Sequence, residues 1–252
     1  MRALIECKRH NHSLSVVIPA LNEADNIQGS IDAVVFAAER HFDDYEIIIV
    51  NDGSNDRTRE IIEANSAVNP RIRVISHKTP WGFGASYHDG RRRAVMTYTV
   101  MVHGDNAFDK DTLSTFFASA GKADVICGYI ANPTARSWFR RAISFAYTIS
   151  MNLLFSMHLK YFNGLQIHKT EWLQRSDLQS DGFGFQAELL IKAIKEGHSY
   201  LEVPTFHTER PGGGKTKIFK MKNIQSVART VIDLLLWNLK RILLSRKRPK
   251  YA

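Results

Sequence analysis

Carboxylate and amide side chains gather in three short clusters, each directly after a segment that is typical of a buried strand. The clusters are Pro19-Ala-Leu-Asn-Glu23, Asn51-Asp-Gly-Ser-Asn-Asp56 and His103-Gly-Asp-Asn106. Any one of them could be a simple turn, because Asn, Asp, Gly and Ser are common turn residues. Three clusters in equivalent positions are hard to explain as turns alone. They indicate a shared ligand-binding site.

Strand-like and helix-like segments alternate over the first 127 residues and position these clusters. Apolar runs of strand length cover residues 14–18, 45–50, 72–75, 97–102 and 124–127. Helical patterns lie between them, over residues 27–38, 55–67, 85–95 and 111–120. Strands that are apolar on both faces and alternate with helices predict an α/β fold, with a mostly parallel sheet covered on both faces. Ligands of such sheets bind beyond the carboxyl ends of the strands, where all three clusters lie.

The composition is that of an ordinary globular protein whose charge is unevenly distributed. Of the 252 residues, 44% are hydrophobic and 23% are charged, which excludes a disordered or collagen-like chain. Two cysteines cannot form a disulfide framework and residues 1–13 do not resemble a signal peptide, so we expect a cytoplasmic protein. Residues 210–252 hold twelve Lys or Arg and one acid, whereas the rest of the chain carries a net charge of −2. Such a tail favours an anionic surface, either phospholipid or nucleic acid, unless it is merely solvated.

Two segments of the second half are typical of helices that are buried or lie at an interface. Residues 142–157 are uncharged and rich in Phe, Tyr, Met and Leu, but they are shorter than the roughly 20 apolar residues that a membrane span requires. An ordinary core helix explains this pattern equally well. Residues 227–244 form a second such segment, and basic residues lie at its end and directly after it. Its expected apolar face consists of Val227, Val231, Leu234, Leu235 and Leu239.

Together, these motifs resemble the inverting glycosyltransferase family 2, whose members have the GT-A fold. Residues 138–144, 184–190, 202–204 and 210–217 are similar to the dolichol- and polyprenyl-phosphate sugar transferase branch of that family. The resemblance covers about residues 14–220. It implies a Rossmann-like GT-A domain over residues 1–210, with an acceptor-side segment at about 131–170. A basic loop and an amphipathic C-terminal helix would follow over residues 211–252.

The resemblance implies a role for each matching residue. The nucleotide pocket would be lined by Pro19, Ala20, Asn22, Glu23, Asn51 and Asp52. Of these, Asp52 would accept a hydrogen bond from the base. Asp105 matches the last acid of the family's Asp-x-Asp motif, which holds the diphosphate through a divalent cation, Mg²⁺ or Mn²⁺. Arg140 and Ser144 match residues that hold the acceptor phosphate. Arg210 and Lys217 match basic residues of a mobile loop that closes over the diphosphate.

The sequence departs from the branch at two points. The usual Asp-x-Asp-x-Gln ligands read His103, Asp105 and Ala107 here. His103 could still bind a metal such as Mn²⁺, which accepts imidazole more readily than Mg²⁺ does, or it could be a plain pocket histidine. The Arg often found after the fifth strand is replaced by Tyr129-Ile130, so the details of acceptor-phosphate binding stay open.

The function expected from the resemblance is sugar transfer from a UDP- or GDP-linked donor to a polyprenyl phosphate. The enzyme would be peripherally attached to the cytoplasmic face of an anionic membrane. A phosphate acceptor, with a second pKa near ~6, is ionised at neutral pH and needs no general base. Glu188 is the candidate base if the acceptor is instead the hydroxyl of a soluble glycan or small molecule; otherwise it is a structural carboxylate. A third alternative, a non-catalytic nucleic-acid-binding module, lacks any recognition motif, so we expect no nucleic acid partner.

Overall fold

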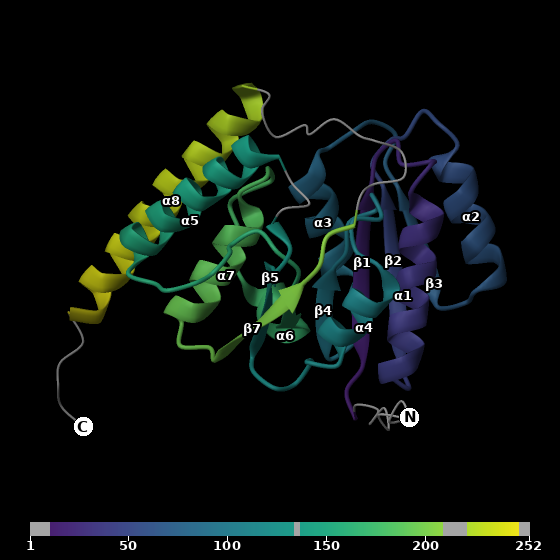
Figure 1. The fold of residues 1–252 in the computed structure, drawn as a ribbon, viewed down its shortest axis with the longest axis horizontal. Helices are drawn as coiled ribbons and strands as arrows, with labels where there is room; N and C mark the ends of the chain where they lie inside the picture. Colours follow the sequence, from purple (N-terminus) through teal and green to yellow (C-terminus); the bar gives the residue numbers. More distant parts are fainter. Residues whose placement is uncertain (1–10, 134–136, 209–220, 247–252) are drawn as a thin grey trace.

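The computed structural model describes residues 11–133, 137–208 and 221–246. Within these residues the chain forms a seven-stranded sheet in the order β3-β2-β1-β4-β6-β5-β7 (Figure 1). The strands are β1 (Leu14–Ala20), β2 (Tyr45–Asn51), β3 (Ile72–Ser76), β4 (Tyr98–Met101), β5 (Val125–Ile130), β6 (Gln166–Lys169) and β7 (Tyr200–Thr205). Every residue of β1 and β2 is buried, because both strands lie inside the sheet and are covered on both faces.

The strand directions confirm the prediction of a mostly parallel sheet. β1 pairs in parallel with β2 and β4, β2 pairs in parallel with β3, and β5 with β7. β6 runs antiparallel to both β4 and β5. The sequence prediction missed β6 because it reads Gln-Ile-His-Lys, with a single apolar residue. It also missed β7, which contains Glu202 and Pro204; this strand tolerates proline because it lies at the edge of the sheet.

Helices cover both faces of the sheet, as the sequence predicts. One face carries α1 (Ile27–His41), α2 (Thr58–Val68) and α4 (Lys110–Phe117), and the other carries α3 (Phe83–Arg92), α6 (Thr170–Arg175) and α7 (Phe185–Lys195). Successive side chains of β1 point to opposite faces of the sheet and show this division. Val16 packs with the core under α1 and α4, whereas Val17 packs with Tyr87 of α3 and Phe185 of α7.

The parallel strands β1 to β4 all end at one edge of the sheet, at the top of Figure 1. The loops that follow them hold the three polar clusters of the sequence. We call this region the polar edge; it consists of residues 19–26, 51–57, 77–82 and 103–108.

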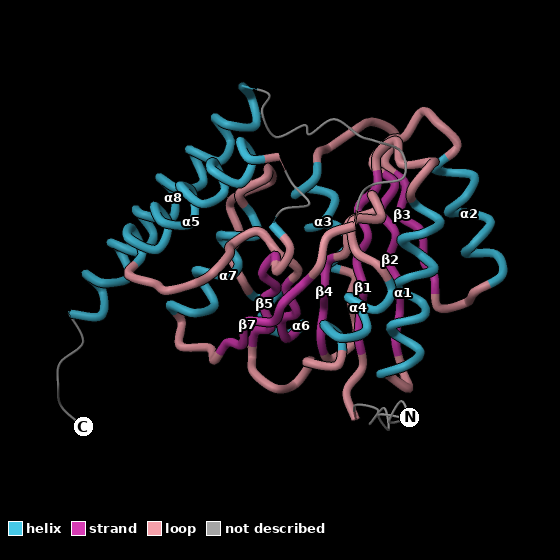
Figure 2. Tube along the Cα trace, viewed as in Figure 1, coloured by secondary structure: helices cyan, strands magenta, loops and turns pink. Residues whose placement is uncertain are grey.

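Two longer helices, α5 (Trp138–Phe155) and α8 (Met221–Arg246), run alongside each other outside α7 (Figures 1 and 2). They share a buried cluster with α7, to which α5 contributes Met151 and Phe155 and α8 contributes Leu234. The helices predicted over residues 142–157 and 227–244 are thus confirmed, and both begin earlier than expected. In the described part of the chain, no helix is long and apolar enough to cross a bilayer.

The outer surfaces of α5 and α8 expose many large apolar side chains, which we call the α5–α8 face. On α5 these are Trp138, Phe139, Ile143, Phe145, Ile149, Leu153 and Leu154, and on α8 they are Met221, Ile224, Ile232, Leu236, Leu239, Ile242, Leu243 and Leu244. The face expected for α8 is divided between inside and outside. Leu234 is buried and Val231 and Leu235 pack against the core, whereas Leu239 is exposed. α8 is therefore apolar on two sides, one packed and one open.

Candidate active site

The clusters after β1 and β2 are joined by hydrogen bonds, as their equivalent positions predict. The backbone N–H of Asp52 donates to the carbonyl of Ala20 (2.9 Å). Asn22, whose φ of 56° is in the left-handed region, donates its backbone N–H to Ser54 Oγ (3.1 Å). Its side-chain Oδ1 accepts from the backbone N–H of Asn55 (2.9 Å). The two loops therefore form one surface.

Glu23 and Asp56 fix the starts of the two helices behind this surface. Glu23 Oε2 accepts from Asn26 Nδ2 (3.0 Å), and the Glu23 backbone N–H donates to Thr58 Oγ1 (2.8 Å). Asp56 accepts from the backbone N–H groups of Thr58 (3.0 Å) and Ala24 (3.1 Å). Burial raises the pKa of Asp56, but the hydrogen bonds from Thr58 and Ala24 outweigh it, so this pKa lies below its usual value. Asp56 is therefore a negative charge that ties α2 to the first loop.

Asp52 is buried and anchors the segment that follows β3. Its Oδ1 accepts from His77 Nδ1 (2.8 Å) and from the Trp81 backbone N–H (2.8 Å), and its Oδ2 accepts from the Gly82 backbone N–H (2.9 Å). His77 Nε2 in turn bonds Asp89 Oδ2 (3.1 Å). The sequence motifs do not include His77 and Trp81. The signal that could have found them is their position directly after β3, which ends at the same edge.

Neighbouring residues hold this arrangement in place. Asn51 accepts from the Ser54 backbone N–H through Oδ1 (3.1 Å), and its carbonyl accepts from the His77 backbone N–H (2.9 Å). Asp89 also receives Arg93 Nη1 (2.7 Å). Burial raises the pKa of Asp89, but hydrogen bonds from His77 and Arg93 lower it more, so this pKa is below its usual value.

Asp105 and His103 lie in the loop after β4, where the sequence predicts a cation site. Asp105 is nearly buried, at 9% exposure. The His103 ring stacks on Phe83, with centroids 5.1 Å apart and planes 16° apart. Asn106, at a φ of 53°, donates its backbone N–H to Ser30 Oγ (2.8 Å). The loop is therefore held against the first turn of α1.

The donor atoms of this loop fit a divalent cation, although they cannot enclose one. A carboxylate oxygen and an imidazole nitrogen are suitable ligands for Mn²⁺. In the described ranges, no three His, Cys, Asp or Glu side chains come together as a metal cluster. A cation at Asp105 would therefore take its remaining ligands from water or from a bound anion.

Glu188, the candidate general base, is a buried carboxylate of α7. Its two oxygens accept from the backbone N–H groups of Gln179 (2.9 Å) and Ser180 (2.9 Å). It also pairs with the buried Lys192 at 2.7 Å. These contacts satisfy its charge and hold the loop before α7, which favours the structural alternative.

The residues that the family resemblance assigns to the acceptor phosphate and the diphosphate lie only partly within the described residues. Arg140 and Ser144 are half-buried and lie four residues apart on the same side of α5. The start of α5 lies at the top of Figure 1, toward the edge at which β1 ends. Arg210 and Lys217 lie outside the described residues.

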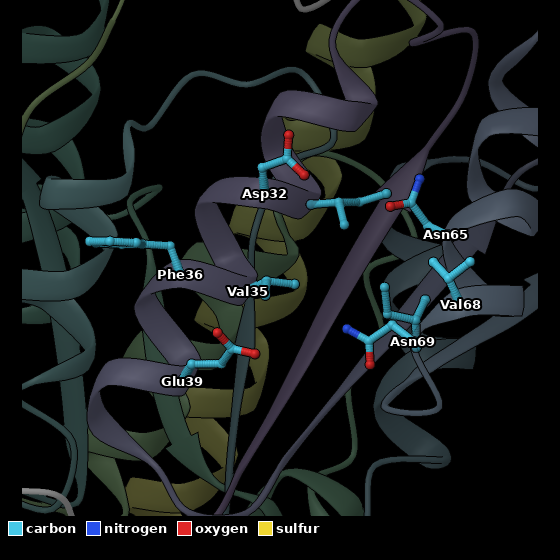
Figure 3. Close-up of a pocket in the computed structure, with 9 residues that line it drawn as sticks. Asp32, Val35, Phe36, Glu39, Asn65, Val68 and Asn69 are labelled. Carbon is cyan, nitrogen blue, oxygen red and sulfur yellow. The ribbon is translucent and has the colours of Figure 1, made fainter.

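A cavity of about 340 Å³ lies elsewhere, between α1 and α2. Figure 3 shows α1 residues on one side and residues of α2 and its C-terminal end on the other. The labelled residues are Asp32, Val35, Phe36, Glu39, Asn65, Val68 and Asn69. None of its lining residues belongs to the polar edge, so the cavity is separate from the candidate site.

The sheet order and the helices on both faces are those of a GT-A-like fold, which is found in glycosyltransferases that use nucleotide-sugar donors. The family model for glycosyl transferase family 2 matches residues 15–192, and the chain belongs to this family. The family resemblance found in the sequence is thus confirmed.

Two similar proteins act on polyprenyl phosphates. The chain is 28% identical to polyprenol monophosphomannose synthase of Mycolicibacterium smegmatis, over 79% of this chain and 78% of that protein. It is 24% identical to undecaprenyl-phosphate mannosyltransferase of Micrococcus luteus, over 78% of this chain and 84% of that protein. These relatives support the polyprenyl-phosphate branch that the motifs of the second half indicate.

Solved structures show the same fold. Glucosyl-3-phosphoglycerate synthase of Mycobacterium tuberculosis, in complex with Mn²⁺, UDP and phosphoglyceric acid, has a TM-score of 0.64 at 19% identity. The match covers 90% of this chain and 78% of that one. The same protein has also been solved with Mg²⁺ and UDP.

Proposed function

We propose that this enzyme transfers a sugar from a UDP- or GDP-linked donor to a polyprenyl phosphate, with inversion at the anomeric carbon. The observation that carries this proposal is the engagement of Glu188 with Lys192 and two backbone N–H groups. A hydroxyl acceptor would need a free general base, whereas an ionised phosphate does not. The polyprenyl-phosphate relatives support the same acceptor.

The reaction is a single displacement. An oxygen of the lipid phosphate attacks the anomeric carbon while the bond from that carbon to the β-phosphate oxygen breaks, and the electron pair leaves with the nucleoside diphosphate. Asp105, with His103 beside it, would hold a divalent cation that supplies positive charge at the diphosphate. Arg210 and Lys217 would add charge there, while Arg140 and Ser144 would hold the acceptor phosphate. The loops after β1 and β2, including Pro19, Ala20, Asn22, Glu23, Asn51 and Asp52, would bind the nucleoside.

The α5–α8 face would place the enzyme on the membrane that contains the acceptor. Large apolar side chains are exposed along both helices, and they are too numerous to be the scattered single residues of an ordinary surface. Basic residues accompany them, including the exposed Arg141 and Lys240 and the strongly exposed Arg229. Shallow insertion of the apolar side chains and attraction to anionic lipids would act together. We propose peripheral docking on the cytoplasmic leaflet, with Arg140 near the level of the lipid phosphates.

A radiolabelled-sugar assay tests the acceptor. The enzyme is supplied with labelled UDP- or GDP-sugars, with Mn²⁺ or Mg²⁺, and with either polyprenyl phosphate in vesicles or water-soluble glycans. We expect label in the lipid extract, and label confined to a water-soluble product would overturn the proposal.

The double variant Glu188→Gln with Lys192→Met tests the argument about the base. It removes both charges of the buried pair together, which avoids leaving one of them unpaired. Removal of a general base typically lowers kcat by about 10²- to 10⁴-fold. We expect kcat of the folded double variant to fall by much less than 10²-fold. A loss of 10²-fold or more would reinstate Glu188 as the general base.

A further inference from the structure

The first turns of α8 pack directly on the 180–184 loop, which precedes α7. A Cβ at Gly182 would lie 1.9 Å from Ser226 Oγ. A Cβ at Gly184 would lie 2.5 Å from Thr230 Oγ1 and 2.7 Å from Thr230 Cβ, so position 184 has no space for a side chain whichever rotamer Thr230 adopts. Because close-packed groups transmit displacement, a shift of α8 must move this loop.

The opposite side of the loop packs equally closely on the start of α3. The carbonyl of Asp181 accepts from the Gly84 backbone N–H (3.1 Å), and a Cβ at Gly84 would lie 2.6 Å from that carbonyl. His88 Nε2, also on α3, bonds the carbonyl of Ser180 (2.9 Å). The loop therefore joins α8 to α3, and neither helix can move alone without breaking these contacts.

Phe183 connects the loop to the polar edge. Its ring stacks on Phe83, with centroids 5.7 Å apart and planes 26° apart, and Phe83 stacks in turn on His103. His103 lies two residues before Asp105 in the loop after β4. An unbroken series of contacts thus runs from α8, through the 180–184 loop, to the loop proposed to hold the cation.

The same turns of α8 belong to the α5–α8 face. Met221 and Ile224 are 68% and 48% exposed and shortly precede Ser226, which contacts the loop. α8 begins at the top of Figure 1, toward the edge at which β1 ends. One helix therefore meets solvent with its apolar side chains and the 180–184 loop with its hydroxyl groups.

We propose that the 180–184 loop couples docking of α8 on an anionic lipid surface to nucleotide binding at the polar edge, with Phe183 as the positioning residue. This inference rests on the proposed function, in which the α5–α8 face docks and the polar edge binds the donor. Docking fixes α8, the helix fixes the loop, and Phe183 fixes the rings of Phe83 and His103. Such coupling is reciprocal, so vesicles tighten nucleotide binding by the same factor by which the nucleotide tightens vesicle binding.

Equilibrium dialysis with the full chain measures the coupling. Labelled UDP and GDP, each with Mn²⁺, are bound in the absence and presence of phosphatidylcholine–phosphatidylglycerol vesicles that contain no polyprenyl phosphate. Coupling between two sites is typically about 5- to 150-fold, so we expect vesicles to tighten binding of the preferred nucleotide by at least about five-fold.

Two kinds of failure are distinguishable in this experiment. Equal nucleotide affinities with and without vesicles, in a protein that sediments with them, would overturn the coupling and leave the proposed function intact. A protein that binds neither nucleotide, or that does not sediment with the vesicles, would overturn the proposed function and this inference with it.

Gly184→Ala tests the contact with α8. Gly184 has a φ of −82° and a ψ of −13°, which suit alanine, but the added methyl group would collide with Thr230. We expect this variant to bring the coupling factor close to one. Adding Thr230→Gly removes the colliding atoms at a small cost in helix propensity and should restore the coupling. Unchanged coupling in the folded single variant, or a loss that the second substitution does not reverse, would overturn this contact as the route.

Phe183→Leu tests the other end of the series of contacts. It keeps an apolar side chain but removes the ring that stacks on Phe83. We expect it to lose the coupling and to sediment with vesicles, in the absence of nucleotide, as the wild type does. Phe36→Leu is the matched control, because Phe36 is also half-buried but lies on α1 at the separate cavity, and it should keep the coupling. Retained coupling in Phe183→Leu, or equal losses in both variants, would overturn the role of Phe183.

Discussion

The polar edge and the α5–α8 face place their side chains in opposite ways. At the polar edge, the carboxylate of Asp52 is buried and accepts three hydrogen bonds. On the α5–α8 face, Trp138 and Leu153 are each 76% exposed. Each arrangement departs from the usual rule that charges lie outside and large apolar groups inside. We propose that each region meets a partner, which is polar at the polar edge and apolar at the α5–α8 face.

The two regions also differ in how firmly they are attached to the core. The loops of the polar edge are joined by many hydrogen bonds, most of them donated by backbone N–H groups. By contrast, α8 is held mainly by side-chain contacts. Thr230 Oγ1 donates to Ser180 Oγ (2.9 Å), and a Cβ at Gly182 would lie 1.9 Å from Ser226 Oγ. Because α8 covers the 180–184 loop in this way, deleting the helix would disturb that loop as well as the α5–α8 face. Point substitutions on the outer side of α8 change the exposed apolar surface and leave its contacts with this loop in place.

The largest expected effect comes from the polar edge. Asp105→Ala removes the acid proposed to neutralise the diphosphate through a cation, and loss of one such charge-stabilising element typically lowers kcat by ~10²-fold or more. We expect the variant to keep its fold and to lose this much turnover in the radiolabelled-sugar assay. Asp111→Ala is the control, since Asp111 is an exposed acid of α4. A kcat within a few-fold of wild type for Asp105→Ala would contradict the cation assignment.

The next effect should be confined to the α5–α8 face. Replacing Leu236, Leu239 and Leu243 of α8 by Ser removes three exposed side chains on one side of the helix. At roughly 0.5–1 kcal/mol for each partly inserted Leu, affinity for anionic vesicles should fall about ten-fold or more. The fraction that stays bound at high salt should fall most, because salt screens only the electrostatic part. Nucleotide affinity should stay unchanged.

A control distinguishes insertion from a general loss of surface hydrophobicity. Val68 and Val95 are 82% and 74% exposed and lie away from α5 and α8. Vesicle sedimentation of the Val68→Ser and Val95→Ser variants should match the wild type. If the triple α8 variant sediments as well as the wild type, the α5–α8 face is not the docking surface.

The sequence predicts the polar edge better than it predicts the contacts inside it. The strands that end there are apolar runs of ordinary length, so β1 to β4 and their polar ends are found correctly. The three hydrogen bonds of Asp52 depend on loops from different parts of the chain, which local patterns do not reveal. Glu188 is an exception, since its partner Lys192 is four residues away on a helix and the pairing is visible in the sequence.

The α5–α8 face shows a different limit. Helical periodicity predicts α8, but it cannot say which apolar side chains face inward. That division depends on the position of α7 and the 180–184 loop, which contact one side of the helix. Whether Leu239 is buried or exposed is therefore decided by packing and not by the helical periodicity of the sequence.

A smaller effect on catalysis tests whether Asp52 serves the donor. Asp52→Ala should raise the donor KM by about ten-fold and change kcat little, because a base contact far from the anomeric carbon is the same in the ground and transition states. The variant should also lose thermal stability, since the Trp81 and Gly82 N–H groups lose their acceptor. Asp52→Asn keeps an acceptor oxygen and should lose less stability. A collapsed kcat with unchanged KM would place Asp52 at the reacting centre instead.

The smallest effect concerns β6, the antiparallel strand that joins the two regions, and it is a change of stability with pH. Burial, with a smaller contribution from His198, lowers the pKa of His168 to about 3. Between an unfolded pKa of about 6.5 and this value, the unfolded chain binds a proton that the folded chain does not, so stability is lost as the pH falls. The free energy of unfolding should drop by about 1 kcal/mol from pH 6.5 to 5.5 through this group alone. Burial also lowers the pKa of His88, which adds a loss of the same sign. Urea denaturation at both pH values measures the free energy of unfolding. This free energy should change less between pH 6.5 and 5.5 in His168→Gln than in the wild type. An equal change in the two proteins would show that His168 is not the group responsible.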